Sequence, residues 1–515
     1  MKYDRIALAL FVFIGVILPA LFSFFTLNTE FLYTEDAAKY VLLGRSLAEG
    51  KGYTSIWEIN PSPHRKYAPL LPVLLSPFSA LSPLNVLMMK ILMKSLAFLC
   101  AIIIFLYFYR RKTGLAGAIL ITAAYVLPAD FLYYSEGPNP LHLYTLLSFL
   151  GLWSLETFID KGSGIVRNAL IASLLCALCF FAKGNGLALI MAGCAVLLLG
   201  APLSPINRRK ALIFVSITMI ALLLWFGRSF LAGGRGEGGY GHSYTSELVM
   251  KNMDVPLEEV RAGAADIAGR ISANAAFYGR NLAVTTNNPY LILLETYLLL
   301  CGIVLAIRKK ETVPAAYWLL YSAIILLFTF RGTRMYTPIR PLSAYFVISG
   351  LSAHAEMAGT FWKRRGSPLF RALEKPLTLL LMPVLVVAIG FAGFDNAAKI
   401  KYAYSCRPQV FWDFMKACEE IKSRTDAADT FYSSIAPALF LYTGRRASYP
   451  PMTRDGDKIL GRIRGDKVKY VMLQGWGNFF SDETIYPFIE ANPRYFKQIY
   501  RNDTCRIYKV EGMRD

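Results

Sequence analysis

Long apolar runs separated by short polar segments extend over most of the chain. The runs cover about 6–28, 84–109, 115–132, 140–158, 167–182, 186–200, 211–232, 290–307, 313–330, 338–358 and 376–394. A helix needs roughly 20 apolar residues to cross a bilayer, so the pattern predicts a polytopic α-helical membrane protein of about eleven spans. The first run ends in bulky residues without a small-residue cleavage site, which favours a retained anchor over a signal peptide.

The composition supports this fold class. Of the 515 residues, 55% are hydrophobic and only 17% are charged. A soluble protein of this length needs more charge to cover its surface. The formal net charge is +20, but the Lys and Arg residues cluster in short loops between apolar runs, which is the pattern that orients membrane proteins. No zinc-finger or other nucleic-acid signature is present, so a nucleic-acid partner is not expected.

Four basic clusters set the expected orientation. They are Arg110–Lys112, Asn207–Lys210, Arg308–Lys310 and Lys363–Arg365. If every run spans, all four lie on one side, and the positive-inside rule makes that side the cytoplasm. The short runs that flank Lys183 keep this parity if they form a re-entrant pair. The N-terminus is then cytoplasmic, and the loop around Asp36, the 233–289 loop and the C-terminal tail are extracytoplasmic. We expect a multi-pass protein of the bacterial cytoplasmic (inner) membrane.

From about residue 395 the composition changes to that of a soluble domain. The pattern predicts a helix over 411–424 and strands over 429–432, 468–473, 495–500 and 505–510. Two domains are therefore expected, a transmembrane domain over 1–394 and an extracytoplasmic α/β domain over 395–515. The second domain holds Cys406, Cys418 and Cys505. This odd number is compatible with one disulfide and one free thiol in an oxidising compartment, and the pairing is left open.

The stretch after the first apolar run carries informative polar residues. Thr34 is a good N-cap, and Glu35 and Asp36 follow in the first helical turn, where acids complement the helix dipole. Asp36 and Tyr40 share one face with apolar residues at helical spacing, which predicts a short amphipathic helix lying on the bilayer. The run 70–81 is too short to span and is interrupted by prolines, which indicates a second surface helix. The two acids either only cap the helix or take part in chemistry.

Charged residues near the outer ends of the predicted spans form a second informative group. A charge at the middle of a span costs about 2.5–3.5 kcal/mol, so such residues face a polar cavity or snorkel to a surface. Snorkelling explains each of them singly. Together they map to the outer leaflet, which indicates an outer cavity suited to an anionic lipid headgroup. They are Lys90, Lys94, Glu136, Lys183, Arg228, Arg331, Arg334 and Arg340.

A glycine-rich segment, 233–242, opens the second large outer loop. A mobile lid over a site and a plain linker both fit this composition. A phosphate-binding loop is not favoured, because no strand precedes the segment and no helix follows it directly. Residues 255–283 are expected to form an amphipathic helix that returns to the membrane.

The order of these elements resembles the GT-C membrane glycosyltransferases, in particular the branch related to lipid A aminoarabinose transferase and the protein O-mannosyltransferases. That family carries an acidic pair, a Tyr and an Ala–Gly pattern in the first outer loop. Pro-Pro-Leu, Ser-Glu, Lys-Gly, Trp-x-x-Arg and Arg-Tyr–Pro–Pro elements follow in that order. The matching positions here are Glu35-Asp36, Tyr40, Ala48, Gly50, Ala68-Pro69-Leu70, Ser135-Glu136, Lys183-Gly184, Trp225, Arg228, Arg334, Tyr336, Pro338 and Pro341.

The resemblance implies an inverting glycosyltransferase that moves a sugar from a polyprenyl-phosphate donor to a lipid, polysaccharide or protein acceptor at the outer face of the membrane. It implies that Asp36 is the general base, with Glu35 as the second catalytic residue. The residues expected to bind the donor phosphate are Lys183, Arg228, Arg331 and Arg334. The residues expected to bind substrate are Tyr40, Tyr67, Glu136 and Tyr336.

Two positions depart from the family pattern. The acids read Glu-Asp rather than Asp-Glu, although the interval from Asp36 to Tyr40 keeps Asp36 in the catalytic register. Tyr67-Ala68 stands where the aminoarabinose transferase has Glu-Lys, so the metal site of that enzyme is not implied. No cofactor and no metal ligand are assigned. A divalent metal is left open, with His64 and His242 as candidate ligands.

Two other classes of function fit many of the same features. A lipid-linked sugar flippase or transporter also needs many spans and cationic residues, but it is expected to line both leaflets with them. A non-catalytic envelope-assembly membrane protein is the third class. The charges here favour one face, and this distribution favours the glycosyltransferase.

Overall fold

The computed structural model describes residues 35–82, 84–111, 113–160, 164–199, 205–231, 249–251, 261–282, 287–364, 409–451, 453–474 and 484–512, with residue 398 and a few single residues between 17 and 27. The predictions for the first and last apolar runs and for the glycine-rich segment concern residues outside these ranges. The predicted domain boundary at 394/395 lies outside them as well.

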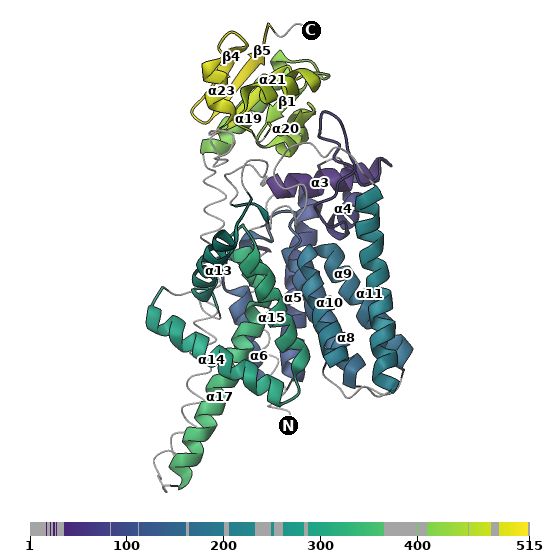
Figure 1. Cartoon of the computed structure of the whole chain (residues 1–515), viewed down its shortest axis with the longest axis vertical. Coiled ribbons are helices and arrows are strands. Elements are labelled where there is room, and N and C mark those ends of the chain that lie inside the picture. The colour runs from purple at the N-terminus through teal and green to yellow at the C-terminus, as the bar shows by residue number, and fades with distance from the viewer. Residues whose placement is uncertain are drawn as a thin grey trace.

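Apolar helices make up the larger part of the described chain, and they follow the predicted runs (Figure 1). In chain order they are α5 (Val86–Arg110), α6 (Gly114–Val126), α8 (Leu141–Asp160), α9 (Ile165–Ala182), α10 (Leu187–Leu199), α11 (Pro205–Leu231), α14 (Pro289–Arg308), α15 (Thr312–Leu327) and α17 (Arg340–Arg364). Among the described residues, four segments are long and apolar enough to cross a membrane by themselves, namely Val86–Arg110, Ile165–Ala182, Arg208–Leu231 and Pro289–Arg308. The predicted helical membrane architecture is confirmed, and the number of eleven spans stays a prediction.

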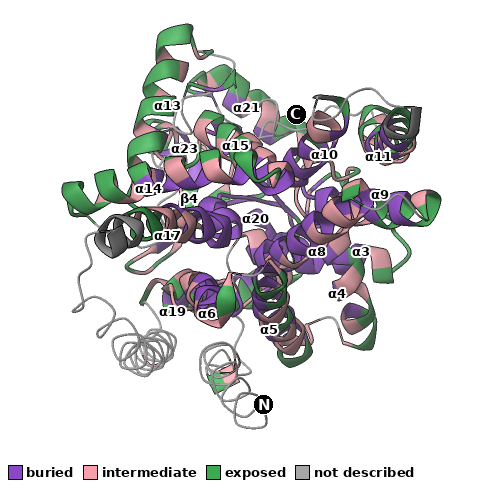
Figure 2. Cartoon of the chain, turned by 90° about the horizontal axis from the view of Figure 1, so that it is seen from below, coloured by how far each residue is buried: buried purple, intermediate pink, exposed green. Residues whose placement is uncertain are grey.

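The outer surfaces of these helices are apolar. Leu223 and Leu224 of α11 and Leu293 and Leu300 of α14 are all exposed. Figure 2 shows buried residues in the interior of the bundle, with α11 and α14 at its periphery. Large apolar side chains exposed side by side on a helix indicate a surface that does not face water. Such helix surfaces are suited to contact with lipid.

The predicted run 115–132 is not one helix. α6 ends at Val126, and the short helix α7 (Ala129–Tyr133) follows Pro128. Proline lacks an N–H donor, and Pro128 itself has an extended ψ of 142°, so the helix breaks there. The break places Asp130 in the first turn of α7.

Two helices of the first predicted outer loop, α3 (Glu35–Ala48) and α4 (Leu70–Leu81), pack against each other at the end of the bundle nearest the C-terminal domain (Figure 1). Gly44 permits this approach, since a Cβ there would lie 3.1 Å from the carbonyl oxygen of Pro72. Residues 37–44 of α3 are all buried. The expectation that α3 lies as an amphipathic helix on the bilayer is therefore wrong, because protein covers all of its faces over two turns.

The C-terminal region forms a small α/β domain around a five-stranded sheet of order β2-β1-β3-β5-β4. β1 pairs in parallel with β2 and β3, and β5 pairs antiparallel with β3 and β4. The strands are β1 (Phe431–Ser433), β2 (Ala447–Ser448), β3 (Tyr470–Gln474), β4 (Phe496–Arg501) and β5 (Cys505–Val510). The helices of the domain are α19 (Gln409–Arg424), α20 (Ala436–Thr443), α21 (Gly456–Gly465) and α23 (Ile485–Ala491).

The helix and the four strands predicted for this domain are confirmed. β2 was not predicted, because two residues are too few to show a strand periodicity. Cys418 and Cys505 are buried free thiols, and Cys406 lies outside the described residues. The helix expected over 255–283 is shorter than predicted and is α13 (Ala264–Gly279).

A polar network around Arg111 lies at the other end of the bundle from α3. The Arg111 guanidinium pairs with Glu156, near the end of α8, and its Nη1 donates to Glu311 Oε2 at 2.9 Å in the turn between α14 and α15. Arg111 belongs to the predicted basic cluster 110–112, and Glu311 directly follows the predicted cluster Arg308–Lys310. Both clusters therefore share one end of the bundle, as the predicted topology requires.

Candidate active site

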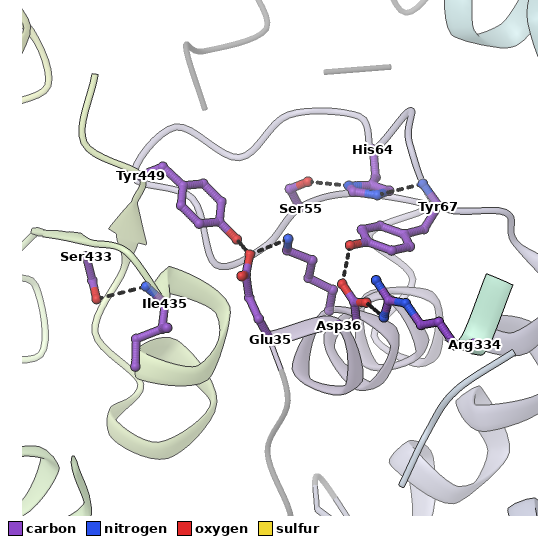
Figure 3. Close-up of polar contacts among 10 residues, drawn as sticks. Glu35, Asp36, Ser55, His64, Tyr67, Arg334, Ser433, Ile435 and Tyr449 are labelled. Atoms are coloured by element: carbon purple, nitrogen blue, oxygen red, sulfur yellow. Dashed lines mark hydrogen bonds and ion pairs between the residues drawn. The ribbon is translucent and has the colours of Figure 1, made fainter. Parts of the chain in front are cut away.

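Asp36, in the first turn of α3, is the centre of a polar cluster at the end of the bundle that faces the C-terminal domain (Figure 3). The hydroxyl of Tyr67 donates to Asp36 Oδ1 at 2.6 Å, and Nη1 of Arg334 donates to Asp36 Oδ2 at 2.7 Å. The side chains of Asp36 and Arg334 are 24% and 31% exposed, so a ligand can reach the ion pair. Two residues far apart in the sequence therefore hold the Asp36 carboxylate.

The surroundings keep Asp36 ionised. Burial acts to raise the pKa of its carboxyl, but the charges of Arg334 and Lys39 and the hydrogen bonds outweigh burial and hold this pKa well below its usual range. Burial and the negative charge of Asp36 raise the pKa of Tyr67 well above its ordinary value. The phenol of Tyr67 therefore keeps its proton and stays a donor to the carboxylate.

Arg334 is held by the short helix α16 (Thr333–Tyr336), which lies between α15 and α17. The hydroxyl of Tyr321 donates to Met335 O at 2.7 Å. The hydroxyl of Thr333 donates to Asp130 Oδ1, also at 2.7 Å. These two bonds fasten α16 to α15 and α7, so the helical bundle directs the guanidinium toward α3.

The loop between α3 and α4 is ordered around His64 (Figure 3). Its Nε2 accepts from the backbone N–H of Tyr67 at 3.1 Å, and its Nδ1 bonds to Ser55 Oγ at 3.0 Å. The ring stacks on Tyr67 with a centroid separation of 5.4 Å. Burial, followed by nearby positive charges, lowers the pKa of His64 to about 3, so the imidazole is neutral. His64 therefore fixes Tyr67, which in turn fixes Asp36.

Two further predicted residues stabilise this loop. Arg228, in the last turn of α11, donates from Nη1 to His64 O at 2.8 Å and from Nη2 to Tyr53 O at 3.0 Å. Tyr40 packs edge-on against Tyr67, with ring centroids 5.0 Å apart. The observed partners of Arg228 are backbone carbonyls. The phosphate-binding role of Arg228 and the substrate-binding role of Tyr40 stay predictions.

Lys183 lies directly after α9, before the 3-10 turn η2 (Gly184–Gly186). Its Nζ is 3.7 Å from Met335 Sδ, in the residue after Arg334. Burial and then repulsion by Arg334 lower the pKa of Lys183 to about 7, while Asp36 acts to raise it. The structure therefore brings Lys183 beside the Asp36–Arg334 pair, and its charge changes near neutral pH.

Glu35 points away from Asp36, toward the C-terminal domain (Figure 3). Lys39 Nζ donates to Glu35 Oε1 at 2.5 Å, and the hydroxyl of Tyr449 donates to the same oxygen. The Lys39 ammonium lies 5.4 Å from the centre of the Tyr67 ring and 5.2 Å from the centre of the Tyr449 ring. Glu35 thus belongs to a second cluster beside Asp36, and its catalytic role stays a prediction.

Sequence reasoning missed two members of this second cluster. Lys39 follows Glu35 at the four-residue spacing of a helical ion pair, so the sequence did hold a signal for it. Tyr449 is 414 residues from Glu35, and no local pattern connects the two.

Of the remaining predicted residues, Glu136 and Tyr336 have their observed contacts elsewhere. Glu136 is fully buried and pairs with Lys94, and Lys90 Nζ is 3.9 Å from its second oxygen. Tyr336 is buried at the end of α16, and Arg331 is exposed just before that helix. Their expected roles in binding substrate or phosphate stay predictions.

The described part of the chain holds no group of three His, Cys, Asp or Glu side chains that could hold a metal ion. Both ring nitrogens of His64 are engaged in hydrogen bonds, and His242 lies outside the described residues. The described side chains around Asp36 offer carboxylate, phenol and cation chemistry. Metal dependence stays open.

Two solved structures share this architecture. Archaeal oligosaccharyltransferase AglB from Archaeoglobus fulgidus, in complex with an inhibitory peptide and a dolichol-phosphate, aligns over 97% of this chain and 73% of its own, with a TM-score of 0.59 and 12% identity. ArnT from Cupriavidus metallidurans, bound to undecaprenyl phosphate, aligns over 98% of both chains, with a TM-score of 0.60 and 11% identity. This chain has the GT-C fold.

The GT-C fold covers both parts of the molecule, because the alignment with ArnT includes the α/β domain as well as the membrane helices. No protein-family model matches the sequence, and no curated protein matches it. The GT-C fold expected from the order of weak motifs is therefore confirmed by structure.

Proposed function

We propose that this chain is an inverting glycosyltransferase of a bacterial cytoplasmic membrane, which moves a sugar from a polyprenyl-phosphate donor to a lipid, polysaccharide or protein acceptor. AglB was solved with a dolichol-phosphate and ArnT with undecaprenyl phosphate. A shared fold alone does not establish a shared function. The chemistry of the Asp36 cluster provides the further support.

The ion pair between Asp36 and Arg334, at 2.7 Å, is the observation that carries the proposal. Transfer from a lipid phosphate needs a base for the proton of the acceptor and a cation for the departing phosphate. The pair supplies both groups in direct contact. It also lies where the membrane helices meet the α/β domain, so a lipid-linked donor and a soluble or lipid acceptor can both approach it.

Without a donor, Asp36 is a weak base. Its pKa is well below the usual range, and Arg334 occupies its Oδ2. A lipid phosphate competes for the guanidinium, because Arg binds phosphate and carboxylate through the same paired N–H groups. Once Arg334 turns to the phosphate, Asp36 loses the largest of the influences that lower its pKa. Donor binding thereby makes Asp36 a stronger base.

The reaction is a single displacement. Asp36 takes the proton from an acceptor hydroxyl or amine as that atom bonds to the anomeric carbon. The bond from the anomeric carbon to the phosphate oxygen breaks, and its electron pair leaves with the lipid phosphate. Because attack comes from the side opposite the leaving group, the anomeric configuration inverts. Arg334 and Lys183 stabilise the charge that develops on the phosphate.

Tyr67 and Arg334 bind different oxygens of the Asp36 carboxylate. Its hydroxyl holds Oδ1, and Arg334 holds Oδ2. When Arg334 moves to the phosphate, Oδ2 becomes the free oxygen, while Tyr67 keeps the carboxylate in place. Oδ2 is therefore the atom that we assign to proton abstraction.

The outer-face location follows from the two ends of the bundle. The Asp36 cluster lies at one end, and the Arg111 network with its flanking basic clusters lies at the other. The positive-inside rule assigns the basic end to the cytoplasm. The Asp36 cluster and the α/β domain are then extracytoplasmic.

Incubation of the purified protein in lipid nanodiscs with a polyprenyl-phosphate sugar and a membrane extract as acceptor source tests the proposal. We expect release of the free lipid phosphate and a product of inverted anomeric configuration, seen by chromatography and NMR. Retained configuration would contradict the single displacement. Translocation of labelled donor in liposomes without phosphate release would identify a transporter instead.

A further inference from the structure

The C-terminal domain contacts α3 at the residue next to Asp36. Tyr449, directly after β2, donates its hydroxyl to Glu35 in the first turn of α3 (Figure 3). Burial and then the charge of Glu35 raise the pKa of Tyr449 well above its ordinary value, so the phenol stays a donor. A side chain of the α/β domain therefore reaches the helix turn that carries the proposed base.

The same domain is anchored on the loop that follows α3. Ala447 N, in β2, donates to Trp57 O at 2.8 Å, and Ile59 N donates to Ser448 Oγ at 3.1 Å. The side chain of Ile59 is buried in an apolar cluster of the α/β domain. The segment 57–59 is thus hydrogen-bonded to the β2 edge of the sheet. These contacts fix the position of Tyr449 relative to α3.

A continuous set of contacts leads from Tyr449 to Asp36. Tyr449 and Lys39 both donate to Glu35 Oε1. Lys39 is only 8% exposed and lies between the rings of Tyr449 and Tyr67. Tyr67 then donates to Asp36 at 2.6 Å. Displacement of Glu35 is therefore transmitted through Lys39 to Tyr67, which donates to the proposed base.

The first turn of a helix is its least constrained part at the N-terminal end, because its N–H groups lack partners within the helix. Asp36 is the second residue of α3. Contacts from outside the helix must therefore hold this turn in place. The bond from Tyr449 to Glu35 is such a contact.

We propose that Tyr449 is a positioning residue for the active site, through which the α/β domain holds Glu35 and the first turn of α3 so that Asp36 is placed for proton abstraction. This inference rests on the proposed function of Asp36 as the base. It assigns the α/β domain a role in placing the base. It assigns Glu35 the role of hydrogen-bond acceptor for Tyr449.

The proposal predicts a selective kinetic effect. Asp36 acts in the proton-abstraction step, whereas the candidate phosphate ligands Arg334 and Lys183 are held by α16 and the end of α9. Loss of the Tyr449 hydroxyl should therefore lower kcat and leave the KM for the donor nearly unchanged. A small displacement of a reacting group lowers a rate by up to about a hundredfold.

Tyr449→Phe is the test variant, and Tyr432→Phe is its matched control. Tyr432 donates to Asp466 at 2.6 Å inside the α/β domain, so the control removes a similar bond without touching α3. We expect Tyr449→Phe to lower kcat by about tenfold to a hundredfold with the donor KM within about twofold of wild type. Tyr432→Phe should match wild type. In a Glu35→Ala background, the loss caused by Tyr449→Phe should be smaller, because no acceptor for the Tyr449 hydroxyl remains at position 35.

Wild-type kcat for Tyr449→Phe, an equal loss in Tyr432→Phe, or fully additive losses with Glu35→Ala would overturn the proposal. A rise in donor KM without a fall in kcat would overturn it too, since that result indicates a binding role.

Hydrogen exchange gives a readout that does not need turnover. Mass spectrometry of peptides from 35–48 should show faster exchange in the first turn of α3 in Tyr449→Phe, but not in Tyr432→Phe, and unchanged exchange would overturn the proposal. The outcomes also separate the two proposals. If wild type releases no lipid phosphate, the proposed function fails, and exchange decides the positioning role. If wild type is active while Tyr449→Phe equals it, only the positioning role fails.

Discussion

The guanidinium of Arg334 and the carboxylate of Asp36 are 298 residues apart in the sequence, and their atoms are 2.7 Å apart in the structure. Each group satisfies the other while no donor is bound. The proposed reaction requires them to separate, with Arg334 on the phosphate and Asp36 on the acceptor. The pair therefore links donor binding to the strength of the base.

Asp36→Asn should abolish transfer. The amide oxygen can still accept from Tyr67, but the side chain no longer takes a proton, so kcat should fall by at least about a hundredfold. Lipid-phosphate release measures this, with the amount of protein in the membrane as a check on folding. Glu49→Gln is the control, because Glu49 is an acid at the other end of α3 that pairs with Arg45 and Lys51. Full activity of Asp36→Asn would remove Asp36 from the mechanism.

Arg334→Gln should move the acid limb of the kcat/KM profile to higher pH. The charge of Arg334 lowers the pKa of Asp36, so its removal raises that pKa. A base works when deprotonated, and activity is therefore lost at a higher pH in the variant. The donor KM should rise as well. A pH–rate profile at low donor concentration measures the shift, and an unchanged acid limb would contradict the coupling.

Lys183 should give the free enzyme a basic limb near neutral pH. Its pKa is lowered to about 7, so its charge is lost as the pH rises through this value, and attraction for the donor phosphate is lost with it. Lys183→Arg keeps its charge at all these pH values and should move the limb to higher pH. The measurement is kcat/KM against pH for both proteins. Identical basic limbs would exclude Lys183 as the titrating group.

Glu136→Leu should destabilise the protein strongly. It leaves Lys90 and Lys94 buried without their shared carboxylate, and breaking such a pair costs about 3–5 kcal/mol. The triple variant with Lys90→Met and Lys94→Met should recover most of the stability, measured by thermal unfolding in detergent. Its transfer activity then tests the predicted substrate role of Glu136. Low activity in a stable triple variant supports that role, and normal activity removes it.

Engineered thiols should place the two ends of the bundle on opposite sides of the membrane. Lys458→Cys lies on α21 of the α/β domain, and Lys309→Cys lies at the end of α14, beside the Arg111 network. An impermeant maleimide should label the first in cells with an intact cytoplasmic membrane, and the second only after permeabilisation. Unsubstituted protein controls for the native cysteines. Labelling of both from the same side would contradict the proposed topology.

The sequence by itself determined most apolar helices of the membrane part, helix α19 and most strands of the α/β domain, and the acids at the start of α3. These features depend on local patterns, namely apolar length, strand alternation and the preference of acids for a helix N-terminus. The sequence held a signal for the break at Pro128, because proline lacks the N–H that a helix uses, but the break was not predicted. The covering of α3 by the α/β domain was not readable, since an apolar helix face does not specify whether lipid or protein covers it.

Only the tertiary structure decided which of the charged residues meet. Arg334, Lys183 and Tyr67 converge on Asp36, whereas the contacts of Glu136 lie with two lysines and those of Arg228 with backbone carbonyls. The sequence assigned all of them to the outer side without distinguishing among them. The physical reason is that hydrophobicity and periodicity set how each segment partitions and coils, while contacts between distant side chains depend on how the finished helices pack together.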